Sequence, residues 1–265
     1  MTDPNHHIDT YEFSADGAGL FAMGPLVSWR QALEPGDYVP GNAVHAWFTR
    51  VPVARWGRQW VATGGMRLRY RRHLDAGTSV VVTAEHTDGI VLTMRDRHDQ
   101  TVYAEAVATV AATAPEVDMA QWPPTTLYSA KAPPTAEGLA GLRLGDIHFT
   151  FDADRDLPPD GWLPDAAWWN EQRCANPAWL SGGINLLLSQ NIAFVDGWTH
   201  AGTTVQSLRP IEHQSAIALR GQVARLFAGG RHQFADVEVL VVANGEPSLL
   251  MTHTIVYAPD RRLVH

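Results

Sequence analysis

The stretch NPAWLSGGINLLLSQN, Asn176 to Asn191, predicts a long apolar helix in the second half of the chain. Asn176 suits the N-cap and Pro177 the first helical position, where a missing N–H is harmless. Apolar side chains then recur at helical spacing, at Leu180, Ile184, Leu187 and Leu188. Gly182 and Gly183 weaken the helix. They indicate either a close approach by a strand or a ligand, or a kink.

Strand-like segments follow this helix. In ADVEVLVVA, residues 235–243, valines alternate with other side chains, as in a strand with one buried face. AGGR, residues 228–231, and NGEP, residues 244–247, carry the residues of hairpin turns. Neighbouring hairpins favour an antiparallel sheet.

The first half repeats this pattern weakly. RYRRHLDAGTSVVV, residues 69–82, is similar to QSLRPIEHQSAIAL, residues 206–219, with Arg72 aligned to Arg209. Each half therefore contains a strand, a loop, an apolar helix and three or four antiparallel strands. Since an apolar helix must be covered, a curved sheet that wraps around it is the economical arrangement.

A segment rich in Pro, Ala and Thr, residues 114–142, separates the halves and is typical of a linker that crosses the surface. We expect an N-terminal unit over residues 1–115, a linker over 116–141 and a C-terminal unit over 142–265. The fold class expected is α+β, with two antiparallel sheets, each wrapped around a long apolar helix.

Composition argues against several classes of function. The net charge is −8 and no basic run is present, so nucleic-acid binding is not expected. No apolar run approaches the roughly 20 residues that span a bilayer. The N-terminus lacks the layout of a signal peptide, so we expect a cytoplasmic protein.

The sequence gives no sign of a metal site or a cofactor. The lone cysteine, Cys174, excludes an intrachain disulfide and is expected in the core. The histidines lack the paired spacing of a zinc helix, and no Gly-rich dinucleotide fingerprint is present. LSGG, residues 180–183, lacks the strand–turn–helix context of a serine nucleophile.

One helix wrapped by an antiparallel sheet, twice in one chain, resembles the double hotdog fold. The closest likeness is to MaoC-like dehydratases and hydratases, and to acyl-CoA thioesterases, of an uncharacterised actinobacterial type. It rests on the helix above and on WTHAGTTVQSLRPI, LRGQVARLFAGGRHQFADVEVLVVANGEP and THTIVYAP. In the first half it rests mainly on the strands between residues 66 and 110.

The MaoC hydratase motif resembles G-D-x-N-P-[IV]-H. NAVH, residues 42–45, matches its end, with Ala43 in place of proline. GDY, residues 36–38, offers an aspartate, Asp37, eight residues before His45, where the motif has five. In the second half Trp179 stands where the motif histidine would fall.

This resemblance implies that His45 is the acid/base, Asp37 its carboxylate partner and Asn42 the group that orients water. A helix N-terminus would supply N–H groups for the thioester oxygen. The alternative is structural, with Asn42 as an N-cap and His45 as a partly buried polar residue.

Substrate contacts are expected from the aromatic-rich helices and the entry to the following strand. The candidates are Asn176, Trp47, Trp179 and His200. For His200 the alternative is a hydrogen-bonded histidine of the sheet.

The function expected first is a MaoC-like hydratase or dehydratase acting on a 2-enoyl or 3-hydroxyacyl thioester of CoA or a carrier protein. A thioesterase on the same fold is the second expectation. A protein that binds or cyclises an apolar natural product is the third. Two units in one chain allow a monomer with an internal pair, or a homodimer.

Overall fold

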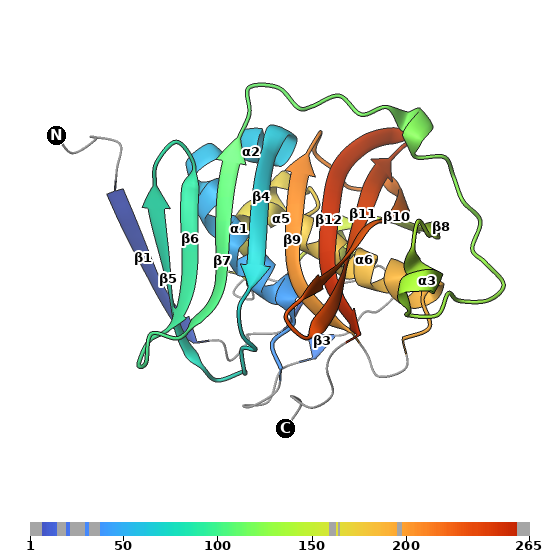
Figure 1. The fold of residues 1–265 in the computed structure, drawn as a ribbon. Coiled ribbons are helices and arrows are strands. Elements are labelled where there is room, and N and C mark those ends of the chain that lie inside the picture. The colour runs from blue at the N-terminus through green and yellow to red at the C-terminus, as the bar shows by residue number, and fades with distance from the viewer. Residues whose placement is uncertain are drawn as a thin grey trace.

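The computed structural model describes residues 7–14, 20–21, 30–31, 38–158, 163, 165–194 and 198–258. Ten of its strands form one antiparallel sheet (Figure 1). In spatial order, the first half contributes β1 (His7–Ser14), β5 (Ser79–His86), β6 (Ile90–Asp96), β7 (Val102–Val110) and β4 (Gly64–Tyr70). The second half continues with β9 (Thr199–Ser207), β12 (Glu246–Ala258), β11 (His232–Ala243), β10 (Ala216–Gly229) and β8 (Arg143–Thr150). A separate pair is formed by β2 (Leu20–Phe21) and β3 (Arg30–Gln31).

The two expected sheets are continuous because β4 pairs with β9 at the junction of the halves. This pairing runs from Gly65 opposite Gln206 to Arg69 opposite Gly202. A Cβ at Gly202 would lie 2.8 Å from the carbonyl oxygen of Leu68, so the close strand approach requires glycine there.

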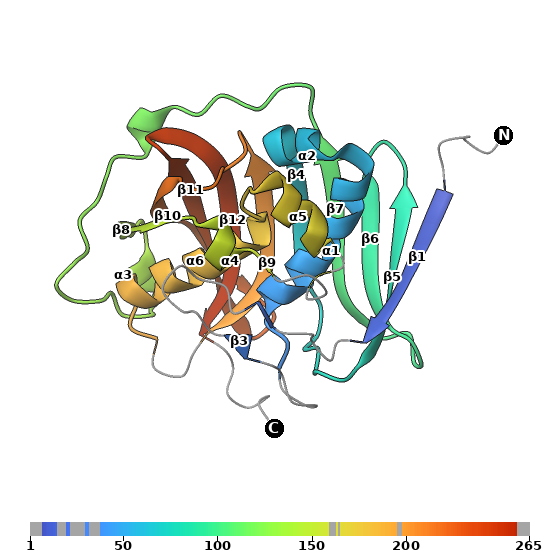
Figure 2. The ribbon, with the colours of Figure 1, turned by 180° about the vertical axis from the view of Figure 1, so that it is seen from behind.

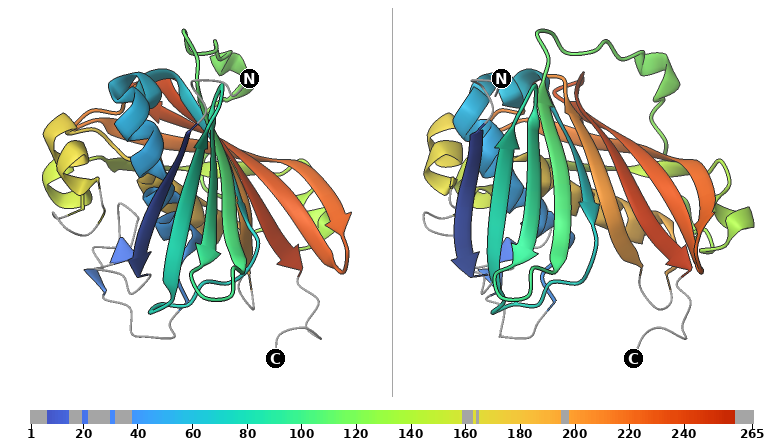
Figure 3. Two further views of the ribbon diagram at one scale, coloured as in Figure 1. Left: turned by 90° about the vertical axis from the view of Figure 1, so that its left-hand side faces the viewer. Right: turned by 60° about the vertical axis from the view of Figure 1, so that its left-hand side comes forward.

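All the longer helices lie on the concave side of the sheet (Figures 2 and 3). In chain order they are α1 (Gly41–Trp56), α2 (Arg58–Thr63), α5 (Ala166–Gln172) and α6 (Pro177–Asn191). The four-residue helices are α3 (Ala136–Leu139) and α4 (Ala153–Asp156), and η1 (Met119–Gln121) is a 3-10 turn. Each half thus wraps its strands around one long buried helix, α1 or α6, and the chain has the predicted double hotdog fold.

Helix α6 begins as predicted. The Oδ1 atom of Asn176 accepts a hydrogen bond of 2.8 Å from the Ala178 N–H, and Pro177 is the first helical residue. Gly183 lies against the sheet, because a Cβ there would be 3.1 Å from Cδ1 of Leu219 in β10. Of the two helix glycines, Gly183 is therefore at a position where a strand approaches the helix closely.

The motif-like segment NAVH, residues 42–45, lies in the first turns of helix α1. The helix begins at Gly41 with Pro40 at the N-cap, so the reading of Asn42 as the N-cap is wrong. The helix is buried on nearly every side from Gly41 to Val53. This explains its weak amphipathic pattern, since both sheet and helices cover it.

The predicted hairpin turns are present. Asn244 and Gly245 have φ values of 51° and 86° between β11 and β12, as a type I′ turn requires. Gly230, with a φ of 60°, lies in the turn from β10 to β11. These residue types therefore set the register of the second half.

The segment between the halves crosses the outer face of the sheet. Trp122 packs there against Ala218 and Leu240, which explains why Leu240 is buried although it points away from the helices. Cys174 lies in the core as predicted, and burial raises the pKa of its thiol to about 12. Within the described residues, no helix has both the length and the hydropathy of a membrane span.

Candidate functional site

A line of polar side chains lies between the two central helices. His45 of α1 faces Ser181 of α6, and Thr49, one turn later in α1, faces Asn176 at the start of α6. The helices therefore run antiparallel. Such a polar line inside an apolar interface needs either complete hydrogen bonding or a function.

His45 occupies the centre of this line. Its side chain is fully buried, and its Nδ1 lies 3.2 Å from Oγ of Ser181. Burial lowers the pKa of His45 to about 4, so the imidazole is neutral near pH 7. Ser181 Oγ also lies 3.5 Å from the Pro177 carbonyl oxygen, which can only accept. When the hydroxyl proton points to Pro177, Nδ1 of His45 carries a proton and Nε2 keeps a free lone pair.

A second polar group surrounds Asp165, just before α5. Its Oδ2 accepts hydrogen bonds from Nε1 of Trp169 at 2.7 Å and from Oγ1 of Thr49 at 3.2 Å. Burial raises the pKa of the Asp165 carboxyl above its ordinary value. Asn176 joins the group by donating to Thr49 at 3.2 Å. These bonds hold α1, α5 and the start of α6 together.

Two histidines of the second-half sheet lie in a buried cluster with Thr203. The rings of His200 and His253 are stacked with centroids 3.9 Å apart. Nε2 of His200 lies 3.0 Å from the Gly202 carbonyl oxygen and 2.6 Å from Oγ1 of Thr203. Oγ1 of Thr203 is also 3.5 Å from Nδ1 of His253. Burial lowers the pKa of His200 to about 3, and also that of His253.

Tyr70, at the end of β4, connects this cluster to the start of α1. Its hydroxyl donates a hydrogen bond of 2.6 Å to the Gly41 carbonyl oxygen, and its ring contacts His200 edge-on with centroids 4.8 Å apart. A charge on His45 would lower the pKa of both His200 and His253, so the three histidines share one buried environment.

Several polar atoms here have no hydrogen-bond partner among the described residues. They are Oδ1 of Asn42, Nε2 of His45, Oδ1 of Asn185 and Nε2 of His253. Asn42 lies one turn before His45, and Asn185 one turn after Ser181, on the same helix sides. Since unpaired buried polar atoms are costly, their concentration indicates a place for water or a ligand.

The residues predicted from sequence fall into separate groups. Asp37 lies outside the described residues, and no carboxylate among those described bonds to His45. Asn176 caps α6 and bonds to Thr49, which is a structural position. Trp179 is buried against Phe149 and Phe151 at centroid distances of 5.6 and 5.2 Å.

Trp47 is half-buried at the edge of the core, and a role in substrate contact stays a prediction for it and for Trp179. Of the predicted residues, the structure brings together Asn42, His45 and His200. Sequence reasoning did not single out Thr203 or Asp165, and it considered Ser181 only as a nucleophile within LSGG. The sequence feature that could have identified them is a polar residue on a helix or strand face that is otherwise apolar.

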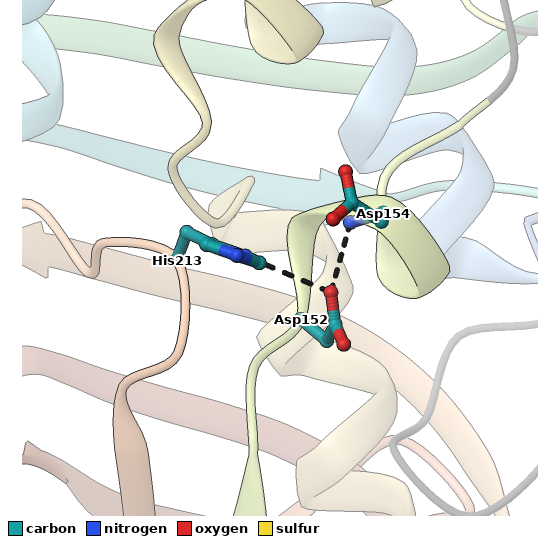
Figure 4. Close-up of side chains that lie close together, drawn as sticks. All are labelled: Asp152, Asp154 and His213. Atoms are coloured by element: carbon teal, nitrogen blue, oxygen red, sulfur yellow. Dashed lines mark hydrogen bonds and ion pairs between the residues drawn. The ribbon is translucent and has the colours of Figure 1, made fainter.

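A different cluster, in a surface region, has the composition of a metal site. Asp152, Asp154 and His213 bring one ligand atom each within 4.8 Å of one another (Figure 4). Both Asp154 oxygens already bond to Arg173, at 2.8 and 3.1 Å, and Nδ1 of His213 accepts from the Ala153 N–H at 3.0 Å. These partners explain the cluster as packing around α4, so the residues do not fit a metal.

Comparison with known proteins places the chain by its fold. No protein-family model and no curated protein matches the sequence. Among solved structures, a MaoC-like dehydratase is 14% identical, with a TM-score of 0.51 over 84% of this chain and 85% of its own. A TesB protein of Mycobacterium avium subspecies paratuberculosis is 13% identical, with a TM-score of 0.51 over 90% and 97%.

The enoyl-isomerase of a trans-acyltransferase polyketide synthase is 10% identical, with a TM-score of 0.54 over 93% and 98%. At these identities the similarity shows the shared fold alone. The chain is therefore similar in fold to MaoC-like dehydratases, TesB-like thioesterases and an enoyl-isomerase.

Proposed function

We propose that the chain is an enzyme that adds water to, or removes it from, an acyl thioester, with His45 as the acid/base. The observation that carries this proposal is the buried neutral imidazole of His45, whose Nε2 has no partner among the described residues. Its other nitrogen is held by Ser181 from the opposite half. Such a group is poised to take a proton and to give it back.

One acid/base group is sufficient for the chemistry. In dehydration of a 3-hydroxyacyl thioester, Nε2 of His45 takes the proton from the α-carbon and leaves an enolate. The bond from the β-carbon to oxygen then breaks, and the departing oxygen takes the same proton and leaves as water. Hydration is the reverse. A single base requires the proton and the hydroxyl to leave from one face of the substrate.

The surroundings suit an apolar acyl chain. Trp198 lies 6.3 Å from the ring of His200, and Phe194 lies 5.8 Å from Trp198, measured between centroids. Both aromatic side chains are partly buried against the core. They would form an apolar wall beside the histidine cluster, where a chain of several methylenes gains by leaving water.

The experiment is a turnover assay with a panel from crotonyl-CoA to 2-dodecenoyl-CoA. Hydration is followed by loss of enoyl absorbance and thiol release with a thiol reagent, for the native chain and for His45→Gln. His98→Gln, at an exposed turn position, is the matched control. We expect hydration by the native chain and the control, and a loss of 10²-fold or more in His45→Gln, in line with removal of a general acid/base.

Thiol release without loss of the enoyl signal would support the thioesterase instead. A shift of the double bond without addition of water would assign His45 to isomerisation. Absence of all three reactions, on CoA and carrier-protein thioesters alike, would reject thioester chemistry.

A further inference from the structure

The two sheet histidines reach the inner face of the sheet through a β-bulge. His200 and Thr203 are an odd number of residues apart, so regular alternation would place them on opposite faces. The register between β9 and β12 shifts between Thr254, opposite Gly202, and Ile255, opposite His200. This bulge turns both His200 and Thr203 inward, beside His253. Bulges of this kind often aim side chains at functional sites.

The hydrogen bonds around Thr203 constrain where the two rings carry their protons. The Gly202 carbonyl can only accept, so Nε2 of His200, 3.0 Å away, carries a proton. Oγ1 of Thr203, 2.6 Å from that nitrogen, therefore accepts from it. The single Thr203 hydroxyl proton then has two acceptors within reach, the Tyr70 hydroxyl and Nδ1 of His253 at 3.5 Å. When Thr203 donates to His253, the proton of His253 is on Nε2, the nitrogen without a described partner.

The two unpartnered ring nitrogens are thus complementary. With these tautomers, Nε2 of His45 has a lone pair, whereas Nε2 of His253 has a proton to donate. Tyr70 holds the first turn of α1 near the ring of His200, and His200 is stacked on His253. The inner face of β7, at the corresponding place in the first half, offers only Ala104, Ala106 and Ala108. Among the described residues, His253 therefore has no polar counterpart on the buried face of β7.

We propose that His253 is a second catalytic residue, which donates a hydrogen bond from Nε2 to the thioester carbonyl oxygen, with Thr203 as its positioning residue. This inference rests on the proposed function. When His45 takes the α-proton, negative charge develops on that oxygen, and a fixed neutral imidazole N–H stabilises it without transferring its own proton. His253 begins and ends the cycle neutral, so the proton balance involves His45 and the substrate alone.

The test compares variants at position 253 on the substrate that the native chain turns over fastest. His253→Phe keeps a ring against His200 but has no donor, whereas His253→Gln keeps an N–H donor. We expect kcat to fall 10²- to 10³-fold in His253→Phe with little change in KM, as for loss of an oxyanion donor, and to recover at least tenfold in His253→Gln. Met251→Leu, on the same buried face of β12, is the control and keeps native kcat.

A second readout does not depend on turnover. Nitrogen-15 NMR of the imidazole rings should show the Nε2–H tautomer for His253 in the native chain, and a mixture of tautomers in Thr203→Val. A dominant Nδ1–H tautomer in the native chain would mean that Thr203 donates elsewhere, for example to Tyr70, and would overturn the assignment.

The two proposals fail in different ways. If His253→Phe keeps native kcat while His45→Gln is inactive, the proposed function stands and the role of His253 is wrong. Equal losses in Phe and Gln variants that remain folded would also contradict a donor role. If the native chain has no thioester activity, both proposals are wrong.

Discussion

The buried histidines should make the fold sensitive to mild acid. Burial lowers the pKa of His45 from 6.5 to about 4 and that of His200 from 6.5 to about 3. Below pH 6.5 the unfolded chain therefore binds protons that the folded chain excludes. The stability that these groups confer is complete above pH 6.5 and is lost as the pH falls towards about 4 and about 3.

The size of the loss follows from these pKa values. Each proton bound only by the unfolded chain removes about 1.4 kcal/mol of stability per pH unit. From pH 6.5 to about pH 5, one such histidine therefore removes about 2 kcal/mol, and His45 and His200 together about 4 kcal/mol. His253 adds to this in the same direction. Domains have only about 5–15 kcal/mol of stability, so the effect is large.

The assay is urea unfolding at about pH 8 and about pH 5, with the change between the two pH values compared across variants. Between these pH values the free energy of unfolding of the native protein should fall by at least about 4 kcal/mol. In His45→Gln and in His200→Gln, the fall should be smaller by about 2 kcal/mol. His98→Gln, at an exposed position, should lose as much as native protein. If His45→Gln and His200→Gln lose as much stability on acidification as the native protein, the buried histidines do not cause the acid sensitivity and the reasoning is refuted.

Three further perturbations test other contacts. Gly202→Ala places a Cβ 2.8 Å from the Leu68 carbonyl oxygen, and urea unfolding should show a loss of roughly 2 kcal/mol; an unchanged midpoint would mean that the β4–β9 junction yields easily. Tyr70→Phe removes the 2.6 Å bond to the Gly41 carbonyl, so thermal unfolding should show a loss of about 1 kcal/mol; a rise in stability would contradict this. The Cys174 thiol is buried, with a pKa of about 12, so a thiol reagent at neutral pH should label it in urea but not in folded protein; rapid labelling of folded chains would disprove its burial.

Local sequence signals predicted much of the second half. Asn176 and Pro177 define the start of α6, because an N-cap acceptor and a residue without N–H act within one turn. Asn244 and Gly245 define a hairpin, because few residues adopt positive φ readily. Helix α1 was harder to recognise, since burial on nearly all sides removes the amphipathic pattern.

The candidate site was predicted only in part. His45, Asn42 and His200 were singled out by motif or position, but their partners could not be. Ser181 is 136 residues from His45 in the chain, and only the antiparallel packing of α1 on α6 brings them together. Asp165, at the start of α5, is 116 residues from Thr49 and likewise meets it only in the folded chain.

The sequence by itself determined the long apolar helix of the second half, the strands with one buried face, and the turns that join them. Spacing and residue type act over a few residues, so these features can be recognised without a fold. Tertiary structure alone decided that β4 pairs with β9 into one sheet, and that a bulge turns His200 and Thr203 to the same side. Pairing and bulge position depend on contacts between distant segments, and the environment that keeps the histidines neutral arises only when both halves have packed.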